Sequence, residues 1–382
     1  MNKIFSVSEY QARLVRVRAA MLRHQLDAIF ITAETNIFYF SGFRPVAPWY
    51  TMTRPNICLI AVSGDPILIV HDVWKGGATA DTAWADVRNF SEMYEPPIAI
   101  VAEAFKDLGL TGARVGAELG YEQRQDMSPN DFGCLQDALP GVTWADGAAA
   151  LWDVRMIKSP AEIAAIRVAC KINSDVFESC YSGLTPEMTE VQLASNLQAG
   201  IAKHGGYFGF LASCMVPDGY ETMSRLPAAR PLIPNTLIWN DIGSIYNGYW
   251  SDFGRAAVIG RATDRQKRMW EGVHAVTQAG IRAAGPGRMP GEIVAACLHE
   301  SVRQGLEMNF ASGRIGHGLG MLLTEPPHIA AYDQQMLHPG MVITLEPGSV
   351  GPEGVYIVEQ NVAITESGTE LLSTGRWQIW EI

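Results

Sequence analysis

Apolar positions in about the first 150 residues switch between helical spacing and short continuous runs. Apolar residues recur at helical spacing from Tyr10 to Met21, which predicts an N-terminal helix. Apolar runs at 57–62 and 66–70, separated by a glycine-containing turn, predict a pair of strands. Further patterns predict helices near 98–107 and 130–138 and a strand near 115–117. This alternation predicts an α/β domain over residues 1–153, in which no catalytic motif is found.

The pattern changes after a short connector at 154–158. Four helices are predicted after it, beginning near Ser159, Glu187, Thr263 and Pro290. Two strand-like segments flank Gly248, and about the last seventy residues alternate between strands and glycine turns. Residues 159–382 are therefore predicted to form a second domain of the α+β class, in which helices pack on one side of a largely antiparallel sheet.

Composition narrows the kind of partner. A length of 382 residues, with 48% hydrophobic and 18% charged residues, is typical of a two-domain globular chain. The formal net charge of −11 argues against nucleic acid or anionic membranes, because both need clustered positive charge. Glu9 interrupts the N-terminus where a signal peptide would continue, and no apolar run approaches membrane-spanning length, so we expect a cytoplasmic protein. A small molecule or a peptide is the expected substrate.

The six cysteines form no CxxC pair and lie mostly in apolar segments. Buried free thiols are therefore expected, rather than disulfides or a zinc site.

Two carboxylates, Asp241 and Asp252, lie eleven residues apart with a turn signal between them that includes Asn247 and Gly248. In a hairpin, a residue on one strand and a residue early in the next can face each other across the ladder. Converging carboxylates repel one another unless a cation lies between them. The alternative interpretation is ordinary turn chemistry, because Asp is common beside Asn and Gly.

Three further residues change the interpretation of this pair. His317 lies among glycines, Glu346 ends an apolar strand, and Glu359 lies on another strand. Each has an ordinary structural explanation when it is taken alone. Together with the two aspartates they supply four carboxylates and one imidazole, which cannot all lie together without compensating positive charge. Two divalent ions would supply it, and Mn²⁺, Co²⁺, Fe²⁺ or Zn²⁺ suits such a donor set.

The order and spacing of these residues resemble the pita-bread metallohydrolases, the peptidase M24 family that includes methionine aminopeptidase, aminopeptidase P, prolidase and creatinase. The resemblance covers nearly the whole chain and extends to 34–42 and to the junction 155–159. It implies a creatinase-type N-terminal α/β domain followed by a C-terminal pita-bread domain with a curved antiparallel sheet covered by helices. It also implies a homodimer.

By this resemblance the metal ligands are Asp241, Asp252, His317, Glu346 and Glu359. Glu346 and His317 are then the expected catalytic residues, with Glu346 passing a proton from the attacking water to the leaving nitrogen. The implied reaction is hydrolysis of a C–N bond by a metallohydrolase, as in Xaa-Pro dipeptidases.

The chain departs from the prolidase pattern at outer positions that hold substrate. Ser224 and Thr324 stand where prolidases carry histidines, and Ile357 stands where an arginine is common. Such groups bind the substrate and stabilise the developing oxyanion, so their replacement leaves the substrate open. Four residues are candidates for substrate binding in their place: Arg54, Arg225, His328 and Tyr356. By resemblance to creatinase dimers, Arg54 would reach the partner's active site.

Other functions stay open at this point. An amidohydrolase or creatinase-like hydrolase of a small modified amino acid would use the same centre, and so would a metal-dependent lyase. A non-catalytic binding module is a third possibility, because some relatives keep the fold as an interaction platform. Retention of all five ligand residues argues against it.

Overall fold

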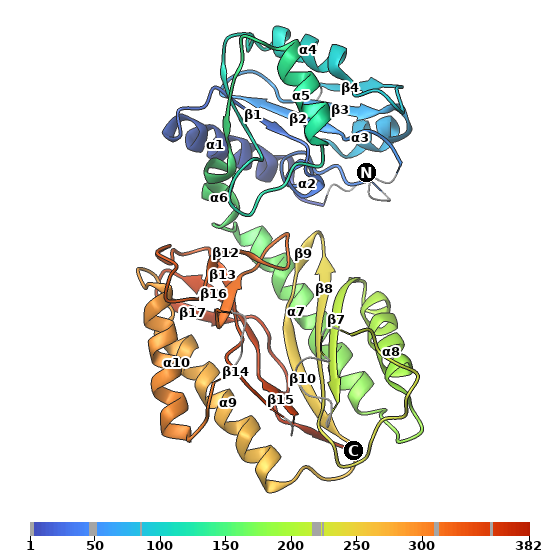
Figure 1. Cartoon of the computed structure of the whole chain (residues 1–382), viewed down its shortest axis with the longest axis vertical. Coiled ribbons are helices and arrows are strands. Elements are labelled where there is room, and N and C mark those ends of the chain that lie inside the picture. Colours follow the sequence, from blue (N-terminus) through green and yellow to red (C-terminus); the bar gives the residue numbers. More distant parts are fainter. Residues whose placement is uncertain are drawn as a thin grey trace. The chain divides into compact units, whose positions relative to one another are not determined.

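The computed structural model describes residues 4–45, 52–84, 86–215, 223, 225–308, 313–351 and 354–382. The chain divides into two compact units, the first ending at Arg155 and the second beginning at Met156 (Figure 1). Helix α6 (Ala148–Arg155) runs through the first two residues of the predicted connector. No helix in the described part of the chain is long and apolar enough to cross a membrane.

The first unit is an α/β domain built on a six-stranded mixed sheet in the order β4-β3-β2-β1-β5-β6. In that order the strands are Val87–Phe90, Ile67–His71, Ile57–Ala61, Ala28–Ile31, Arg114–Ala117 and Thr143–Asp146. The other α-helices, α1 to α5, are Val7–Arg23, Glu34–Ser41, Lys75–Asp81, Ile98–Asp107 and Pro129–Ala138. β1 is antiparallel to β2 and parallel to β5. The α/β class and the predicted helices and strands of this unit are confirmed.

Aromatic side chains fill the core between this sheet and helices α4 and α5. Phe30 of β1 lies 6.3 Å from Phe105 of α4, 6.4 Å from Phe132 of α5 and 5.5 Å from Trp144 of β6, measured between ring centroids. Burying each such ring contributes roughly 1.5–3 kcal/mol. Phe30, Phe105 and Phe132 belong to one buried core cluster of the first unit, and Trp144 packs against it.

The second unit contains two five-stranded sheets and a two-stranded ribbon among its described residues. One sheet has the order β18-β10-β8-β7, with β9 also paired to β8, and these strands are Trp380–Glu381, Phe253–Val258, Ile238–Tyr246, Tyr207–Met215 and Tyr249–Trp250. The other has the order β12-β11-β13-β16-β17, which are Glu325–His328, Gly316–Gly318, Val342–Leu345, Gln360–Thr365 and Gly368–Leu371. The ribbon pairs β14 (Gly348–Gly351) with β15 (Gly354–Ile357). Only β10–β18 is parallel among the strand pairs described in this unit.

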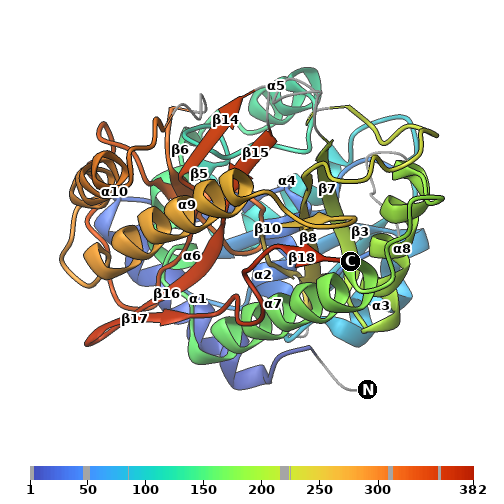
Figure 2. The same ribbon diagram turned by 90° about the horizontal axis from the view of Figure 1, so that it is seen from below.

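Four long helices cover these sheets. They are α7 (Pro160–Tyr181), α8 (Glu190–Lys203), α9 (Asp264–Ala283) and α10 (Pro290–Gln304). Helix α7 packs on β8 and on α8, and α9 packs on β13, β15 and α10. Figures 1 and 2 both show α9 and α10 lying together on the side of β14 and β15, and α7 with α8 on the side of β7 and β8. The predicted α+β class is confirmed.

The start of α7 is tied to the strands that carry the two aspartates. Ser159 and Glu162 form the predicted capping box, in which the Ser159 amide donates to Glu162 Oε2 at 2.7 Å. The other oxygen of Glu162 accepts a hydrogen bond from the Tyr249 hydroxyl at 2.5 Å. Glu162, the third residue of α7, therefore anchors β9 through Tyr249, three residues before Asp252.

The predicted turn between β8 and β9 lies at Asn247 and Gly248, which have φ angles of 51° and 86°. This left-handed pair favours the right-handed twist of a tight hairpin, and glycine adopts it at little cost. Chain reversal here returns the chain toward Asp241, and Asp252 lies in the interruption between β9 and β10.

Candidate metal centre

Asp241 and Asp252 converge, although they are not direct partners in the ladder. Asp241 lies within β8 and is paired with Gly254 of β10, while Asp252 immediately precedes β10. Glu359 precedes β16 in the neighbouring sheet. One oxygen from each of these three carboxylates lies within 4.8 Å of the others. Asp252 and Glu359 are buried and Asp241 is half-buried.

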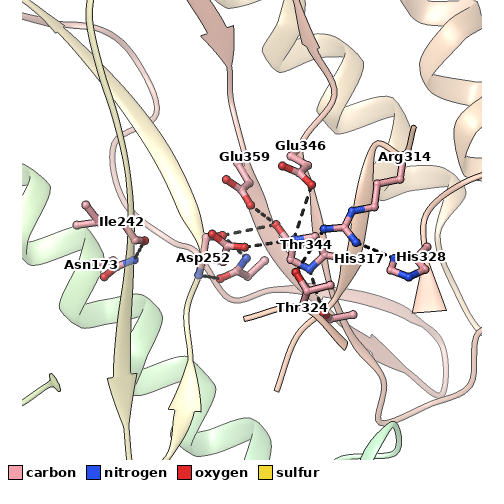
Figure 3. A network of polar contacts seen from close by, with 12 residues as sticks. Asn173, Ile242, Asp252, Arg314, His317, Thr324, His328, Thr344, Glu346 and Glu359 are labelled. Atoms are coloured by element: carbon pink, nitrogen blue, oxygen red, sulfur yellow. Dashed lines mark hydrogen bonds and ion pairs between the residues drawn. The ribbon is translucent and has the colours of Figure 1, made fainter. Parts of the chain in front are cut away.

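His317 joins Asp252 to the remaining glutamate. Its Nε2 lies 3.3 Å from Asp252 Oδ2 and 3.7 Å from Glu346 Oε1, as Figure 3 shows. Its Nδ1 lies 2.9 Å from the Gly318 carbonyl oxygen, which can only accept a hydrogen bond. Nδ1 therefore carries a proton that it donates to this oxygen, and Nε2 is directed at the carboxylates, where it would be available to a metal ion.

A row of polar residues across three strands supports the carboxylates. His317, Thr344 and Asn361 are consecutive partners across β11, β13 and β16. The Thr344 hydroxyl donates to Glu359 Oε1 at 2.6 Å. Asn361 Oδ1 accepts from the Asp252 amide at 3.0 Å, and its Nδ2 donates to the Asp252 carbonyl at 2.5 Å. Both ends of the Asn361 amide thus fix the backbone of one acidic residue.

Sequence reasoning missed these two supports. The signal was available in the strand period of two, because Thr344 lies two residues before Glu346 and Asn361 lies two residues after Glu359. A residue two positions from a functional strand residue shares its face of the sheet. Polar residues at such positions in otherwise apolar strands are candidates for support of the site.

The loop that follows His317 is fixed by a buried ion pair. Lys158 Nζ lies 3.0 Å from Glu325 Oε2, and the two side chains are 2% and 1% exposed. The other Glu325 oxygen accepts from the amides of Met321 and Leu322 at 3.0 and 3.1 Å. Because these bonds satisfy a charge that burial would otherwise penalise, the loop between β11 and β12 has one defined position.

Electrostatic repulsion at the cluster is severe. Burial raises the pKa of Asp241 well above its ordinary value, and the charges of Asp252 and Glu346 add to the rise. Burial also raises the pKa of Glu359 well above its ordinary value, with further contributions from Asp241 and Asp252. Without a cation, the carboxylates therefore resist ionisation together.

The pKa of His317 is also set by opposing effects, but here the neighbouring charges outweigh burial. Burial lowers the pKa of His317, but its bond to Asp252 and the charges of Glu346 and Asp252 outweigh burial and raise it. The acidic surroundings of the imidazole thus attract positive charge.

The donor set fits divalent metal ions. Asp241 Oδ1 and Glu359 Oε2 are buried and accept no hydrogen bond from any residue that the structure describes. Buried carboxylate oxygens without a partner are costly, and a cation would satisfy them. Asp252 lies in both groups of ligand atoms, one with Asp241 and Glu359 and the other with His317 and Glu346. Carboxylate oxygens with one imidazole nitrogen are typical ligands of first-row divalent metals.

The four predicted substrate-binding residues lie in different surroundings. Arg54, in the first unit, donates from Nη1 to Asp131 Oδ2 at 3.1 Å and from Nε to the Tyr94 carbonyl at 2.6 Å. Arg225 is exposed, and its neighbour Ser224 lies outside the described residues. Tyr356 is 3% exposed and belongs to a hydrophobic core cluster.

Of these four residues, His328 lies next to a proposed metal ligand in the sheet. It ends β12, is paired with His317, and its Nδ1 lies 2.8 Å from Nη1 of Arg314. Substrate binding by the four residues stays a prediction. Arg314, which the sequence did not single out, also lies 3.3 Å from Thr324, measured between Nη2 and Oγ1.

Comparison with known proteins agrees with this architecture. Residues 164–366 match the model of metallopeptidase family M24, and residues 13–157 match the creatinase/prolidase N-terminal domain. The chain is 26% identical to the Xaa-Pro dipeptidase of Pyrococcus furiosus over 369 residues, which cover 94% of this chain and 97% of the relative.

Solved structures share the whole fold. The dipeptidase PepE from Mycobacterium ulcerans superposes with a TM-score of 0.84 at 25% identity, with 99% of each chain covered. An Xaa-Pro dipeptidase from Bacillus anthracis superposes with a TM-score of 0.84 at 21% identity, and the superposition covers 98% of this chain and 100% of the dipeptidase chain. At this identity the likeness supports the fold alone. Both domains of the pita-bread architecture are thereby confirmed. The chain belongs to metallopeptidase family M24 and is a metallohydrolase with a creatinase-type N-terminal domain.

Proposed function

We propose that this metallohydrolase cleaves the C–N bond of Xaa-Pro dipeptides, using two divalent metal ions held by Asp241, Asp252, His317, Glu346 and Glu359. The observation that carries the proposal is the convergence of Asp252 with both the Asp241/Glu359 pair and the His317/Glu346 pair. The family is one of metallopeptidases, and the relative from Pyrococcus furiosus is an Xaa-Pro dipeptidase.

Metal ions bound by this set would act as Lewis acids on the scissile carbonyl and lower the pKa of water. The chain's own residues keep these donors in place: Thr344 orients Glu359, and Asn361 fixes the backbone of Asp252. His317 presents Nε2 to the centre because its Nδ1 donates a hydrogen bond to the Gly318 carbonyl oxygen. Preorganised donors of this kind lower the cost of reorganisation during the reaction.

Glu346 is the proposed proton carrier. Its side chain is 14% exposed, whereas Asp252 and Glu359 are buried, so water and substrate reach it more easily than those two residues. A carboxylate oxygen of Glu346 accepts one proton from the attacking water as the new C–O bond forms. It then delivers this proton to the nitrogen as the C–N bond breaks. The products are a carboxylic acid and an amine, and Glu346 returns to its starting state.

A substrate panel tests the proposal. Metal-free protein is loaded separately with Mn²⁺, Co²⁺, Fe²⁺ or Zn²⁺ and assayed with Xaa-Pro dipeptides, N-acyl amino acids and cyclic amidines. We expect turnover of the dipeptides and its loss in Asp252→Ala. Turnover confined to the other two classes would favour the amidohydrolase alternative, and elimination products would favour a lyase. Metal content below about one equivalent would defeat the metalloenzyme account.

A further inference from the structure

The backbone that carries Glu359 lies outside the strand ladders. Val358 and Glu359 fall between β15, which ends at Ile357, and β16, which begins at Gln360. Neither of these two residues has a partner in the registers of the two strands. Buried carbonyl groups outside a ladder still require hydrogen-bond donors. Side chains from other parts of the second unit supply them here.

Two side chains of the other five-stranded sheet hold the Glu359 segment, residues 357–359. Trp239 Nε1, on β8, donates to the Ile357 carbonyl at 3.1 Å. Arg255 Nη1, on β10, donates to the Glu359 carbonyl at 3.0 Å. Both donor residues are 1% exposed, so water does not compete for these hydrogen bonds.

The two donors are neighbours of the proposed ligands on their own sheet. Trp239 precedes Asp241 by two residues on β8, so the two side chains point to the same face of the sheet. Arg255 follows Asp252 by three residues. The sheet that carries both aspartates is therefore bonded directly to the backbone of Glu359, whose carboxylate converges with theirs.

Arg255 bonds two further carbonyl groups. Its Nη1 also donates to Gly254 at 2.8 Å, and its Nε donates to Arg376 at 3.0 Å. A guanidinium is a rigid planar fork of N–H donors, so hydrogen bonds from two of its nitrogens fix the position of the whole group. Arg255 thus joins β10, the Glu359 segment and the chain around Arg376.

A close approach of backbone and ring fixes Trp239. A Cβ atom on Gly254 would meet atoms of the Trp239 indole at 2.9 Å, which is closer than such atoms approach one another. Gly254 is also the ladder partner of Asp241. The absence of a side chain on this partner therefore lets the indole lie against β10 and reach the Ile357 carbonyl.

Helix α9 supplies a third donor to the segment. The Thr277 hydroxyl lies 2.9 Å from the Val358 carbonyl oxygen and 3.1 Å from the Val273 carbonyl oxygen of its own helix. A hydroxyl has one proton, which these two acceptors share. The undivided bonds to the segment are those from Trp239 and Arg255.

We propose that Trp239 and Arg255 are positioning residues, which set the distance between Glu359 and the two aspartates and thereby the affinity of the centre for metal. The inference rests on the proposed metal ligands and deepens the proposed function, because it assigns the residues that hold one ligand in place. Both bonds go to the backbone of the segment. They fix where Glu359 lies, whereas Thr344 orients its carboxylate.

The first test removes one hydrogen bond. Trp239→Phe keeps an aromatic ring in the core but loses the N–H group that reaches Ile357. Trp270→Phe is the matched control, because Trp270 is equally buried in the same core cluster and donates to the Trp377 carbonyl at 2.6 Å. Denaturant unfolding establishes that both variants fold, and we expect similar losses of stability in the two.

The second test changes the guanidinium. Arg255→Lys keeps the positive charge but loses the fork of donors. Arg13→Lys is the matched control, because Arg13 of the first unit is also 1% exposed and donates from Nη1 to the Tyr39 carbonyl at 2.7 Å. If Arg255→Lys does not fold, Trp239→Phe alone decides the proposal.

Metal affinity is the readout that a merely structural role would not move. Competition of the metal-free proteins with a chromogenic chelator should show affinity about 10–100-fold weaker in Trp239→Phe and Arg255→Lys. Trp270→Phe and Arg13→Lys should keep wild-type affinity. The visible spectrum of bound Co²⁺ reports ligand geometry and should change only in the first two variants. Wild-type affinity in either of them, or an equal loss in its control, would overturn that residue's positioning role.

Hydrogen exchange separates this inference from the proposed function. Amide exchange over residues 357–361 of metal-free protein should be faster in Trp239→Phe and Arg255→Lys than in wild type, and unchanged in the controls. If wild type binds metal but cleaves no dipeptide, the proposed function fails, and the affinity comparison still decides the positioning role. If wild type binds no metal, faster exchange shows structural support alone and the inference is wrong.

Discussion

Asp252 and His317 meet across two different sheets, with 3.3 Å between Asp252 Oδ2 and His317 Nε2. Asp252 immediately precedes β10 and His317 lies on β11, and these two strands belong to separate five-stranded sheets. The same aspartate has a carboxylate oxygen within 4.8 Å of ligand atoms of Asp241 and Glu359. It is therefore the residue that links the two halves of the proposed dinuclear centre.

This linkage predicts unequal effects of two substitutions. Asp252→Asn should lose nearly all bound metal, because both halves share its carboxylate, whereas His317→Gln should keep about one equivalent in the Asp241/Glu359 half. Metal content by mass spectrometry after gel filtration measures both. Equal losses in the two variants would contradict the separation into halves.

Asn361 should affect metal binding through the backbone of Asp252. Asn361→Leu leaves the buried Asp252 amide without its acceptor, so we expect a loss of roughly 1–3 kcal/mol in unfolding free energy together with weaker metal binding. Asn56→Leu is the matched control, because Asn56 is a fully buried asparagine of the first unit that accepts from the His71 amide. It should lose stability but keep wild-type metal affinity. Denaturant unfolding and metal titration measure the two quantities.

Thr344→Val tests the orientation of Glu359. Valine nearly preserves the volume but removes the 2.6 Å hydrogen bond to Glu359 Oε1. Loss of such a support typically weakens metal affinity about 10–100-fold. Thr236→Val, at an exposed hydroxyl that donates to Ile233, should leave the affinity unchanged. Competition with a chromogenic chelator gives the two affinities, and a wild-type value for Thr344→Val would show that this bond has no role.

The metal-free protein should lose stability as pH rises. The pKa values of Asp241 and Glu359 are raised above the ordinary 3.8 and 4.5, so the folded state holds their protons more tightly than the unfolded chain. Their contribution is complete below those ordinary values and is lost as pH rises above them. Thermal unfolding of chelated protein should therefore show a melting temperature that falls as the pH rises above these ordinary values, and bound metal should oppose the fall.

The double variant Asp241→Asn/Glu359→Gln provides the control for this pH dependence. The melting temperature of the chelated double variant should fall less steeply with pH than that of chelated wild type. A residual slope is expected from Glu118 in the first unit, because burial raises the pKa of that carboxyl to about 7. Identical slopes in wild type and the double variant would remove the metal centre as the cause.

Much of the architecture follows from local signals. Capping residues such as Ser159 and Thr263 marked helix starts, and the left-handed pair Asn247-Gly248 marked the hairpin. These features depend on a few neighbouring residues, so they can be predicted from the sequence. The five proposed ligand residues lie on or beside predicted strands, but their assignment as ligands came from the resemblance to the family.

The surroundings of the site could not be predicted in this way. Arg314, Thr324 and His328 come together because β11 and β12 pair and because Lys158, far away in sequence, fixes the loop between them through Glu325. The packing of Tyr356 in a hydrophobic cluster could not be predicted from its position beside Ile357 either, and its proposed role in substrate binding stays a prediction. Contacts of this kind depend on the register of several strands, which the sequence does not specify one residue at a time.

Titration of metal-free wild type with Co²⁺ or Mn²⁺, with turnover of an Xaa-Pro dipeptide as the readout, tests the central claim most directly. The account predicts no turnover without metal and a rise to a plateau at about two equivalents per chain. In Asp252→Ala, added metal should restore nothing. Turnover by the chelated enzyme, or by Asp252→Ala at the wild-type rate, would contradict a centre built on Asp241, Asp252, His317, Glu346 and Glu359.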